Sequence, residues 1–158
     1  MKFKTETSAG GIVYKRGKTQ NKNSTRKSAK KILWLITQHS QHKGWGFPKG
    51  LIGDKDSSEK MQDAALREVE EEGGVKAKIV LDNPVKVKYK YRFKDFLVDK
   101  TVYYFLMEYI SGNPKNHDWE VSEAKFLNED EIKKILTYKS DKEAFEQAIK
   151  LLESRKNL

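Results

Sequence analysis

The sequence contains no cysteine and no long hydrophobic run. The absence of cysteine excludes disulfide bonds, thiolate metal ligands and a cysteine nucleophile, so a metal ion must be bound by oxygen atoms or by the three histidines. No stretch approaches the roughly 20 apolar residues of a membrane-spanning helix, and the first residues lack the apolar segment of a secretory signal. We therefore expect a cytoplasmic protein that makes no contact with a membrane.

Acidic residues are missing from one segment, residues 15–31, which contains eight lysines and arginines. This segment supplies nearly all of the formal net charge of +9. Most of its other residues are Ser, Thr and Asn, which bury little apolar surface, so we predict a flexible basic loop. Its charge leaves open an alternative, in which the loop contacts an anionic substrate or nucleic acid.

The chain of 158 residues fits one domain, because single cores of roughly 100 to 200 residues are the usual unit. Apolar and basic residues alternate from residue 85 to residue 94, which predicts a strand with one apolar and one basic face. The order of elements predicts an α+β or α/β sandwich. Strands are predicted over residues 3–14, 32–36, 85–94, 101–110 and 121–127, and helices over residues 57–72, 129–136 and 141–152. The first helix is expected to be capped by Ser57 or Ser58 and ended by Gly73 and Gly74.

This first helix gathers carboxylates on one face, because residues three and four positions apart lie together on a helix. They belong to Glu68, Glu71 and Glu72. A divalent cation relieves the repulsion between them, and Mg²⁺ prefers oxygen ligands of this kind. Arg67 lies four residues before Glu71 and can hold that carboxylate in place. The alternative is a solvated acidic helix with no ligand.

A longer spacing pattern surrounds this helix. A glycine at 53 is followed by five residues, a glutamate at 59, seven residues, and then Arg-Glu-Val-x-Glu-Glu-x-Gly-Val over residues 67–75. This pattern resembles the Nudix box at all of its specified positions, which include Gly53, Glu59, Arg67, Glu68, Glu71, Glu72 and Gly74. The resemblance implies one Nudix hydrolase domain over residues 1–158. Its fold would be an α/β/α sandwich with a mixed central sheet, a catalytic helix after the glycine-rich loop, and helices at the C-terminal end.

Further segments resemble the branch of this family that hydrolyses diadenosine tetraphosphate. They are residues 100–104, 119–121 and 139–145, whereas residues 47–50 resemble the lead-in that is common in the family as a whole. The resemblance implies that a backbone carbonyl near Gly50 joins Glu68, Glu71 and Glu72 as a metal ligand. Gly50 stands three residues before Gly53, so the loop that enters the helix is longer by three residues than is usual in that branch.

The resemblance also implies a catalytic set. Arg67, Glu68 and Glu71 belong to it, and a carboxylate must accept the proton of the attacking water. Members of the family use either a glutamate of the box or one from a distal loop, so Glu68 and Glu120 are both candidates for this base. Glu120 could equally be an ordinary surface residue.

Substrate binding is predicted at residues outside the box. Lys49 is expected to stabilise the leaving phosphate, and Lys100 to hold a more distal phosphate. His42 is a candidate contact to phosphate or base, and Phe93 with Tyr104 is the preferred aromatic pair for stacking on adenine. For each of these residues an ordinary surface or core role is the alternative.

The predicted function is Mg²⁺-dependent hydrolysis of a phosphoanhydride, with diadenosine tetraphosphate giving ATP and AMP, and with Mn²⁺ able to replace Mg²⁺. Another polyphosphate is the first alternative: an ordinary or damaged nucleoside triphosphate, the 5′ end of RNA, or an inositol pyrophosphate. A Nudix-fold binding module without catalysis is the second alternative. The partner is then a small nucleoside polyphosphate, and the protein is a monomer or a homodimer.

Overall fold

A mixed sheet forms the centre of the fold in this computed structural model, which describes residues 1–17, 31–53 and 56–156. Its strands in this described part are β1 (Lys2–Gly17), β2 (Lys31–His39), β3 (Trp45–Gly46), β4 (Lys49–Leu51), β5 (Val75–Ile79), β6 (Val85–Phe93), β7 (Phe96–Gly112) and β8 (Val121–Asn128). The helices there are α1 (Met61–Gly73), the short 3-10 helix η1 (Pro114–Asn116), α2 (Glu129–Ile135) and α3 (Lys139–Lys156). All of the predicted strands and helices are present with shifted ends, whereas β5 and the short β3 and β4 were not predicted.

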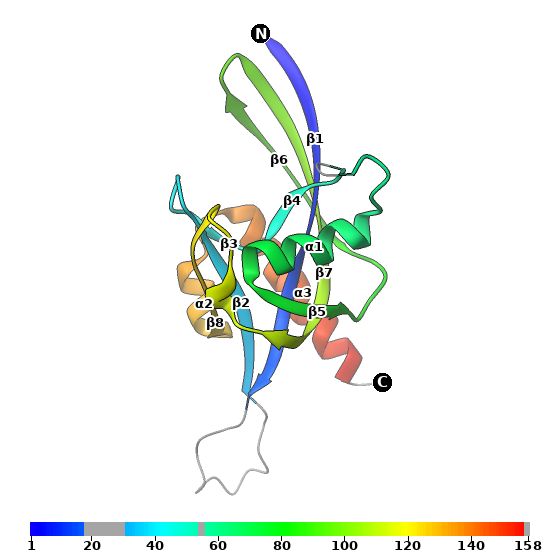
Figure 1. Ribbon diagram of the computed structural model, residues 1–158, viewed down its shortest axis with the longest axis vertical. Coiled ribbons are helices and arrows are strands. Elements are labelled where there is room, and N and C mark those ends of the chain that lie inside the picture. Colours follow the sequence, from blue (N-terminus) through cyan, green and yellow to red (C-terminus); the bar gives the residue numbers. More distant parts are fainter. Residues whose placement is uncertain (18–30, 54–55, 157–158) are drawn as a thin grey trace, which may run out of the picture.

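Strand β1 lies in the middle of the sheet (Figure 1). It pairs in parallel with β7, from Lys2 opposite Phe96 to Tyr14 opposite Glu108, and it pairs antiparallel with β2 and β4. Its second half is buried without alternation. A continuous buried run is typical of a strand that is covered on both faces.

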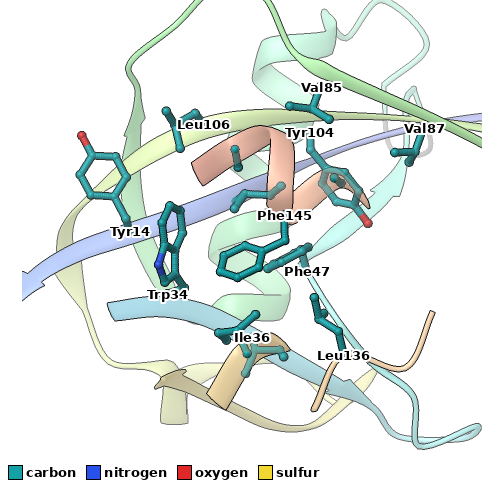
Figure 2. Packing of buried hydrophobic residues seen from close by; sticks show 14 of the residues in the cluster. Tyr14, Trp34, Ile36, Phe47, Val85, Val87, Tyr104, Leu106, Leu136 and Phe145 are labelled. Atoms are coloured by element: carbon teal, nitrogen blue, oxygen red, sulfur yellow. The ribbon is translucent and has the colours of Figure 1, made fainter. Parts of the chain in front are cut away.

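Helices cover both faces of this sheet, so two apolar clusters form. On one face, Ala65 and Val69 of α1 pack with Ala9, Val13 and Phe105 of the sheet. The other cluster joins α2 and α3 to the opposite side chains of the sheet, and includes Trp34, Phe47, Tyr104, Leu106 and Phe145 (Figure 2). These two layers confirm the predicted α/β/α sandwich.

Helix α1 begins later than predicted, at Met61, and its N-cap residue Lys60 makes no side-chain capping bond. Ser58 instead donates from its backbone nitrogen and its hydroxyl to Asp56 Oδ1, at 3.0 and 2.8 Å. The cap by Ser57 or Ser58 is therefore wrong, because both serines lie before the N-cap residue, and Ser58 belongs to a short turn with Asp56. The predicted stop is confirmed: Gly74 takes a left-handed φ of 72° and donates its N–H to the Glu70 carbonyl.

Strands β6 and β7 and the first residues of β1 extend beyond the helices as a projecting arm (Figure 1). The predicted alternation of β6 is confirmed over most of its length, because Val85 and Val87 are buried while Lys86 and Lys88 are exposed. Phe93 departs from it with 57% of its surface exposed. It lies at the tip of the arm, where none of the described helices covers the apolar face.

The two ends of the predicted basic loop, residues 15–31, lie in strands. Residues 15–17 belong to β1 and Lys31 begins β2, and the Lys15 ammonium lies 4.6 Å from the centre of the Tyr109 ring. Residues 18–30 lie outside the described residues, so the loop itself stays a prediction. Across the described part of the chain, no helix combines the length and the apolar character needed to span a membrane.

Candidate active site

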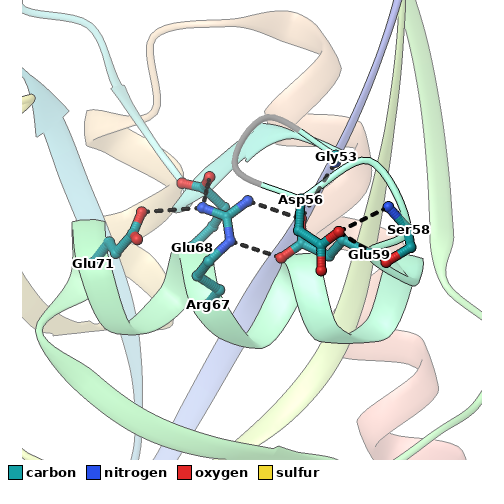
Figure 3. Close-up of polar contacts among 7 residues, drawn as sticks. All are labelled: Gly53, Asp56, Ser58, Glu59, Arg67, Glu68 and Glu71. Carbon is teal, nitrogen blue, oxygen red and sulfur yellow. Dashed lines mark hydrogen bonds and ion pairs between the residues drawn. The ribbon is translucent and has the colours of Figure 1, made fainter.

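Arg67 is the centre of the acidic cluster on α1 (Figure 3). Its Nε and Nη2 donate to the two carboxylate oxygens of Glu59, at 2.7 and 3.0 Å. Its Nη1 donates to Glu68 Oε1 at 2.8 Å and to Glu71 Oε2 at 3.1 Å. The predicted contact between Arg67 and Glu71 is confirmed, and the same guanidinium also ties the loop before α1 to the helix, since Gly53 N donates to Glu59 Oε1 at 3.3 Å.

Glu68 is almost fully buried, with 5% of its surface exposed. Its carboxylate lies directly against the Gly50 backbone, because a Cβ added at Gly50 would stand 2.1 Å from Glu68 Oε1. Burial raises the pKa of Glu68 to about 7, the neighbouring Arg67 charge opposes this shift, and the negative charges of Glu71 and Glu120 add to it. Gly50 therefore leaves the space that this carboxylate occupies.

Glu72 accepts a hydrogen bond from the backbone nitrogen of Lys49, the residue before Gly50 in β4, at 3.3 Å. Burial raises the pKa of Glu72 to about 8; the Lys49 charge opposes this shift, and the charges of Glu68 and Glu120 add to it. The structure thus brings Glu120, which immediately precedes β8, close enough to act on both carboxylates. Glu70 is exposed, as its place on the helix predicts.

The three box carboxylates lie near one another, but they do not converge on one point. Glu68 and Glu71 share the Arg67 guanidinium, and Glu72 turns towards the Lys49 backbone. Among the described residues, no three acidic or histidine side chains are placed so that they could enclose an ion as they stand. The predicted three-carboxylate set therefore needs side-chain rotation before it could share a ligand.

Lys49 is the first residue of β4 and lies near charged and polar groups of α3, β6 and α1. Burial alone lowers the pKa of Lys49, but the nearby Asp141, Tyr89 and Glu72 together outweigh it and raise the pKa. The ammonium therefore stays protonated at neutral pH. Asp141 of α3 is the buried acidic residue that sequence reasoning missed, because only the fold brings α3 to this strand end.

Lys100 is buried on β7, and its Nζ lies 3.4 Å from Glu6 Oε1 on β1. Tyr91 of β6 donates its hydroxyl to the same oxygen. Burial lowers the pKa of Lys100, and the Glu6 charge opposes this shift. The predicted phosphate contact of Lys100 stays a prediction, and Glu6 is a partner that the sequence did not reveal.

His42 lies in the turn between β2 and β3. Its ring stacks on His39, with ring centres 4.0 Å apart and planes at 9°, and its Nδ1 lies 3.0 Å from the Tyr138 hydroxyl. Burial lowers the pKa of His42, and so do the positive charges of His39 and Lys49. The structure places His42 within reach of the Lys49 charge, while its predicted contact to a substrate is untested.

The predicted aromatic pair of Phe93 and Tyr104 is not brought together. The Tyr104 ring is buried in the core, edge-on to Phe47 at 5.8 Å, and its hydroxyl donates to Asp141 Oδ1 at 2.9 Å. Tyr104 pairs with Val85, which lies at the opposite end of β6 from Phe93. At about 3.3 Å per residue, Val85 and Phe93 are about 26 Å apart along the strand. The proposed stack on adenine by these two rings is therefore wrong.

The NUDIX domain family matches residues 23–148, which is most of the chain. The protein belongs to the Nudix family. This Nudix chain is 30% identical over 109 residues to a Mycobacterium tuberculosis protein named "Putative mutator protein MutT4". The matched region covers 69% of the chain and 42% of that protein, so the chain spans less than half of the relative's length.

Solved Nudix structures share this fold. The crystal structure of a C. elegans Ap4A hydrolase superposes with a TM-score of 0.65 and 24% identity, covering 94% of this chain and 98% of the other. The NUDIX domain of Shewanella oneidensis NrtR, complexed with ADP ribose, gives a TM-score of 0.63 and 18% identity, covering 94% and 88%. At these identities the similarity is one of fold.

Proposed function

We propose that this Nudix protein is a Mg²⁺-dependent pyrophosphohydrolase that cleaves a phosphoanhydride in a nucleoside polyphosphate. The observation that carries the proposal is the buried Glu68 carboxylate, set directly against the Gly50 backbone. The raised pKa values of Glu68 and Glu72 mean that the charges around them compensate their anionic forms poorly. A cation at this position would relieve that cost.

The donor atoms available here fit Mg²⁺, because they are all oxygens. Glu68, Glu71, Glu72 and the Gly50 carbonyl would hold the ion, and Mn²⁺ could replace it. When bound, such an ion supplies neutralisation of phosphate charge and makes water more acidic. Arg67 contributes position, since its guanidinium orients Glu68 and Glu71 from one side.

The remaining steps belong to side chains of the protein. The oxygen of a water molecule bonds to phosphorus while the anhydride P–O bond breaks, and a carboxylate accepts the proton of that water. Glu68 and Glu120 are both candidates for this base, and the charge of Glu120 already acts on Glu68. The protonated Lys49 offers a positive charge to the leaving phosphate.

Diadenosine tetraphosphate, cleaved to ATP and AMP, is the proposed substrate. Four linked phosphates need several cationic contacts, and the ammonium groups of Lys49 and Lys100 lie near enough to affect each other electrostatically. The fold similarity to the C. elegans Ap4A hydrolase, over 94% of this chain, supports the same choice.

The test is hydrolysis of diadenosine tetraphosphate with Mg²⁺, followed by separation of the nucleotide products. We expect ATP and AMP in equal amounts and, for Glu71→Gln, a rate lower by about 100-fold or more, as for the loss of a preorganised charged group. Glu70→Gln is the matched control, because Glu70 lies on the same helix but faces solvent, and it should retain the rate within twofold. Equal rates for Glu71→Gln and Glu70→Gln would refute the role of Glu71 in hydrolysis. Activity confined to other polyphosphates would refute the substrate alone.

A further inference from the structure

The arm carries a row of unpaired positive charges on one face. On β6, every second residue is exposed and basic, and this set consists of Lys86, Lys88, Lys90 and Arg92. We call this side of the arm the basic face. None of the four forms an ion pair with any residue that the structure describes. Alternate strand positions lie about 7 Å apart, so four cations follow a line of about 20 Å.

The strand register shows what lies beside each cation. Four cross-strand rows run from β6 through β7 to β1: Lys86–Tyr103–Ala9, Lys88–Thr101–Thr7, Lys90–Asp99–Thr5 and Arg92–Leu97–Phe3. The face thus combines positive charge with threonine hydroxyls and with one aromatic ring at each end. Asp99 is the acidic residue within these rows, so the basic face keeps an excess of three positive charges.

The two rings at the ends of the basic face differ in exposure. Phe3 has 76% of its surface exposed. Tyr103 is half-buried, and the Lys86 ammonium lies 5.9 Å from its ring centre. Phe3 therefore offers an exposed aromatic face on which a nucleic-acid base can stack, since every base has an aromatic face of its own.

The basic face begins close to the candidate active site. Gly50 pairs with Ala9, Ala9 pairs with Tyr103, and Tyr103 pairs with Lys86. Three strand spacings of about 4.8 Å place Lys86 about 14 Å from Gly50. Ala9 packs under α1, so this row opens on the side of the sheet that carries the box glutamates.

We propose that the basic face binds single-stranded nucleic acid along the arm. A linear row of cations, with hydroxyl groups and rings between them, is complementary to a chain that carries one phosphate per nucleotide. An anionic membrane is the competing partner, because Met1 and Phe93 are exposed at the tip. The rings at the tip, however, do not form a purely apolar surface for insertion into a membrane. The Lys94 ammonium lies 5.3 Å from the centre of the Phe93 ring, and the Lys2 ammonium lies 5.8 Å from the centre of the Phe96 ring.

The test measures fluorescence anisotropy of labelled 12-nucleotide RNA and DNA strands with the full chain, in EDTA so that hydrolysis plays no part. The arm variant combines Lys88→Gln, Lys90→Gln and Arg92→Gln. The matched control combines Lys134→Gln, Lys142→Gln and Lys150→Gln, which are exposed positions on α2 and α3 and remove the same charge.

The arm variant should bind at least tenfold more weakly than the control. Its log–log salt slope should be shallower by about 2, because each lost phosphate contact on a single strand accounts for about 0.7. Phe3→Ser should weaken binding about fivefold or more through the lost stacking. Thermal unfolding midpoints that match the wild type would show that all variants are folded.

Two results would overturn the proposal. One is equal affinity of the arm variant and the control, which would assign any binding to other basic segments. The other is arm-dependent binding to vesicles of phosphatidylcholine and phosphatidylserine without binding to either oligonucleotide, which would make the arm a membrane contact. Because the measurement needs neither metal nor turnover, its failure is separate from failure of the proposed hydrolase activity.

Discussion

The guanidinium of Arg67 and the carboxylate of Glu59 form a two-point contact, with N–O distances of 2.7 and 3.0 Å. Glu59 belongs to the loop before α1, and Arg67 lies in the second turn of that helix. Both side chains are largely buried, with 10% of the Glu59 side chain and 19% of the Arg67 side chain exposed. This contact therefore fixes the position of the loop relative to the helix that carries the box carboxylates.

Replacing Arg67 with lysine should remove that two-point contact while keeping the charge, because an ammonium group cannot present the same planar pair of donors. We expect a loss of about 1–3 kcal/mol in the free energy of unfolding and a fall in kcat of about tenfold to 100-fold, since small misplacements of catalytic groups carry costs of that size. Urea unfolding and steady-state kinetics measure the two effects. Lys60→Ala is the control, because the Lys60 side chain makes no capping bond. An Arg67→Lys enzyme with normal kcat would show that the contact has no positioning role.

Gly50→Ala tests the close approach of Glu68 to the backbone of β4. The added Cβ would stand 2.1 Å from Glu68 Oε1, so the carboxylate or the strand must move. We expect destabilisation of about 1–3 kcal/mol, typical of overpacking, together with a loss of Mg²⁺-dependent activity. Isothermal titration with Mg²⁺ and thermal unfolding provide the measurements. Leu51→Ala, at the exposed neighbouring position, should leave Mg²⁺ affinity unchanged, and a normal affinity in Gly50→Ala would remove this carboxylate from the ligand set.

Tyr104→Phe should lower the free energy of unfolding and leave substrate binding unchanged. It removes the hydroxyl that donates to buried Asp141 at 2.9 Å, and a lost buried hydrogen bond typically costs about 1–3 kcal/mol. KM for the polyphosphate should stay within twofold of the wild-type value, because the ring lies in the core. Phe93→Ser should change unfolding by less than about 0.5 kcal/mol, as expected for an exposed site. A large rise in KM for Tyr104→Phe with unchanged stability would contradict the core assignment.

The ionised Glu6 carboxylate contributes to the free energy of unfolding, and this contribution is lost at acid pH. Burial alone raises the pKa of Glu6, but the Tyr91 hydrogen bond and the Lys100 charge together lower it below the ordinary value of 4.5. A carboxyl group with a depressed pKa in the folded state stabilises the protein above its unfolded pKa, and this contribution is lost as pH falls through the folded pKa.

Glu6→Gln should therefore be less stable than the wild type by about 1.5–3 kcal/mol at pH 7, the scale of one hydrogen bond to a charged group. The difference should shrink as the pH falls below 4.5. Urea unfolding at pH 7, 4.5 and 3 follows the change, and Tyr91→Phe should weaken the same pH dependence. A difference that stays constant over this range would show that the ionised form of Glu6 contributes nothing.

Local spacing in the sequence was sufficient to predict the contact between Arg67 and Glu71 on α1. Arg67 and Glu71 lie four residues apart on a helix, so their contact follows from helical geometry alone. The partner of the same guanidinium, Glu59, lies eight residues earlier in a loop, and only the spacing of the box singled it out. The alternation of buried and exposed residues along β6 is likewise a local property. The prediction held along the strand except at its end, where Phe93 is exposed.

Contacts between distant elements could not be predicted in this way. Lys100 and Tyr104 lie on the same face of β7, yet Tyr104 is sealed by Phe47 and α3 while Lys100 meets Glu6. Which of these positions is covered depends on how far along β7 the helix α3 extends. The alternation of residues along one strand carries no information on the position of that helix. The helix cap failed for a local reason, because α1 begins only at Met61, and Ser58 lies in the preceding turn, where it donates to Asp56.

The parallel pairing of β1 with β7 has a consequence for how the chain reaches its native state. Lys2 meets Phe96 and Tyr14 meets Glu108, so each pair closes a loop of more than 90 residues. During synthesis, β1 is made before β7 and must wait for it before this edge is paired. Closures of this length slow folding because chain entropy is lost before the contacts form. We therefore expect refolding in the range of milliseconds to seconds, with an exposed β1 edge that favours aggregation at high protein concentration.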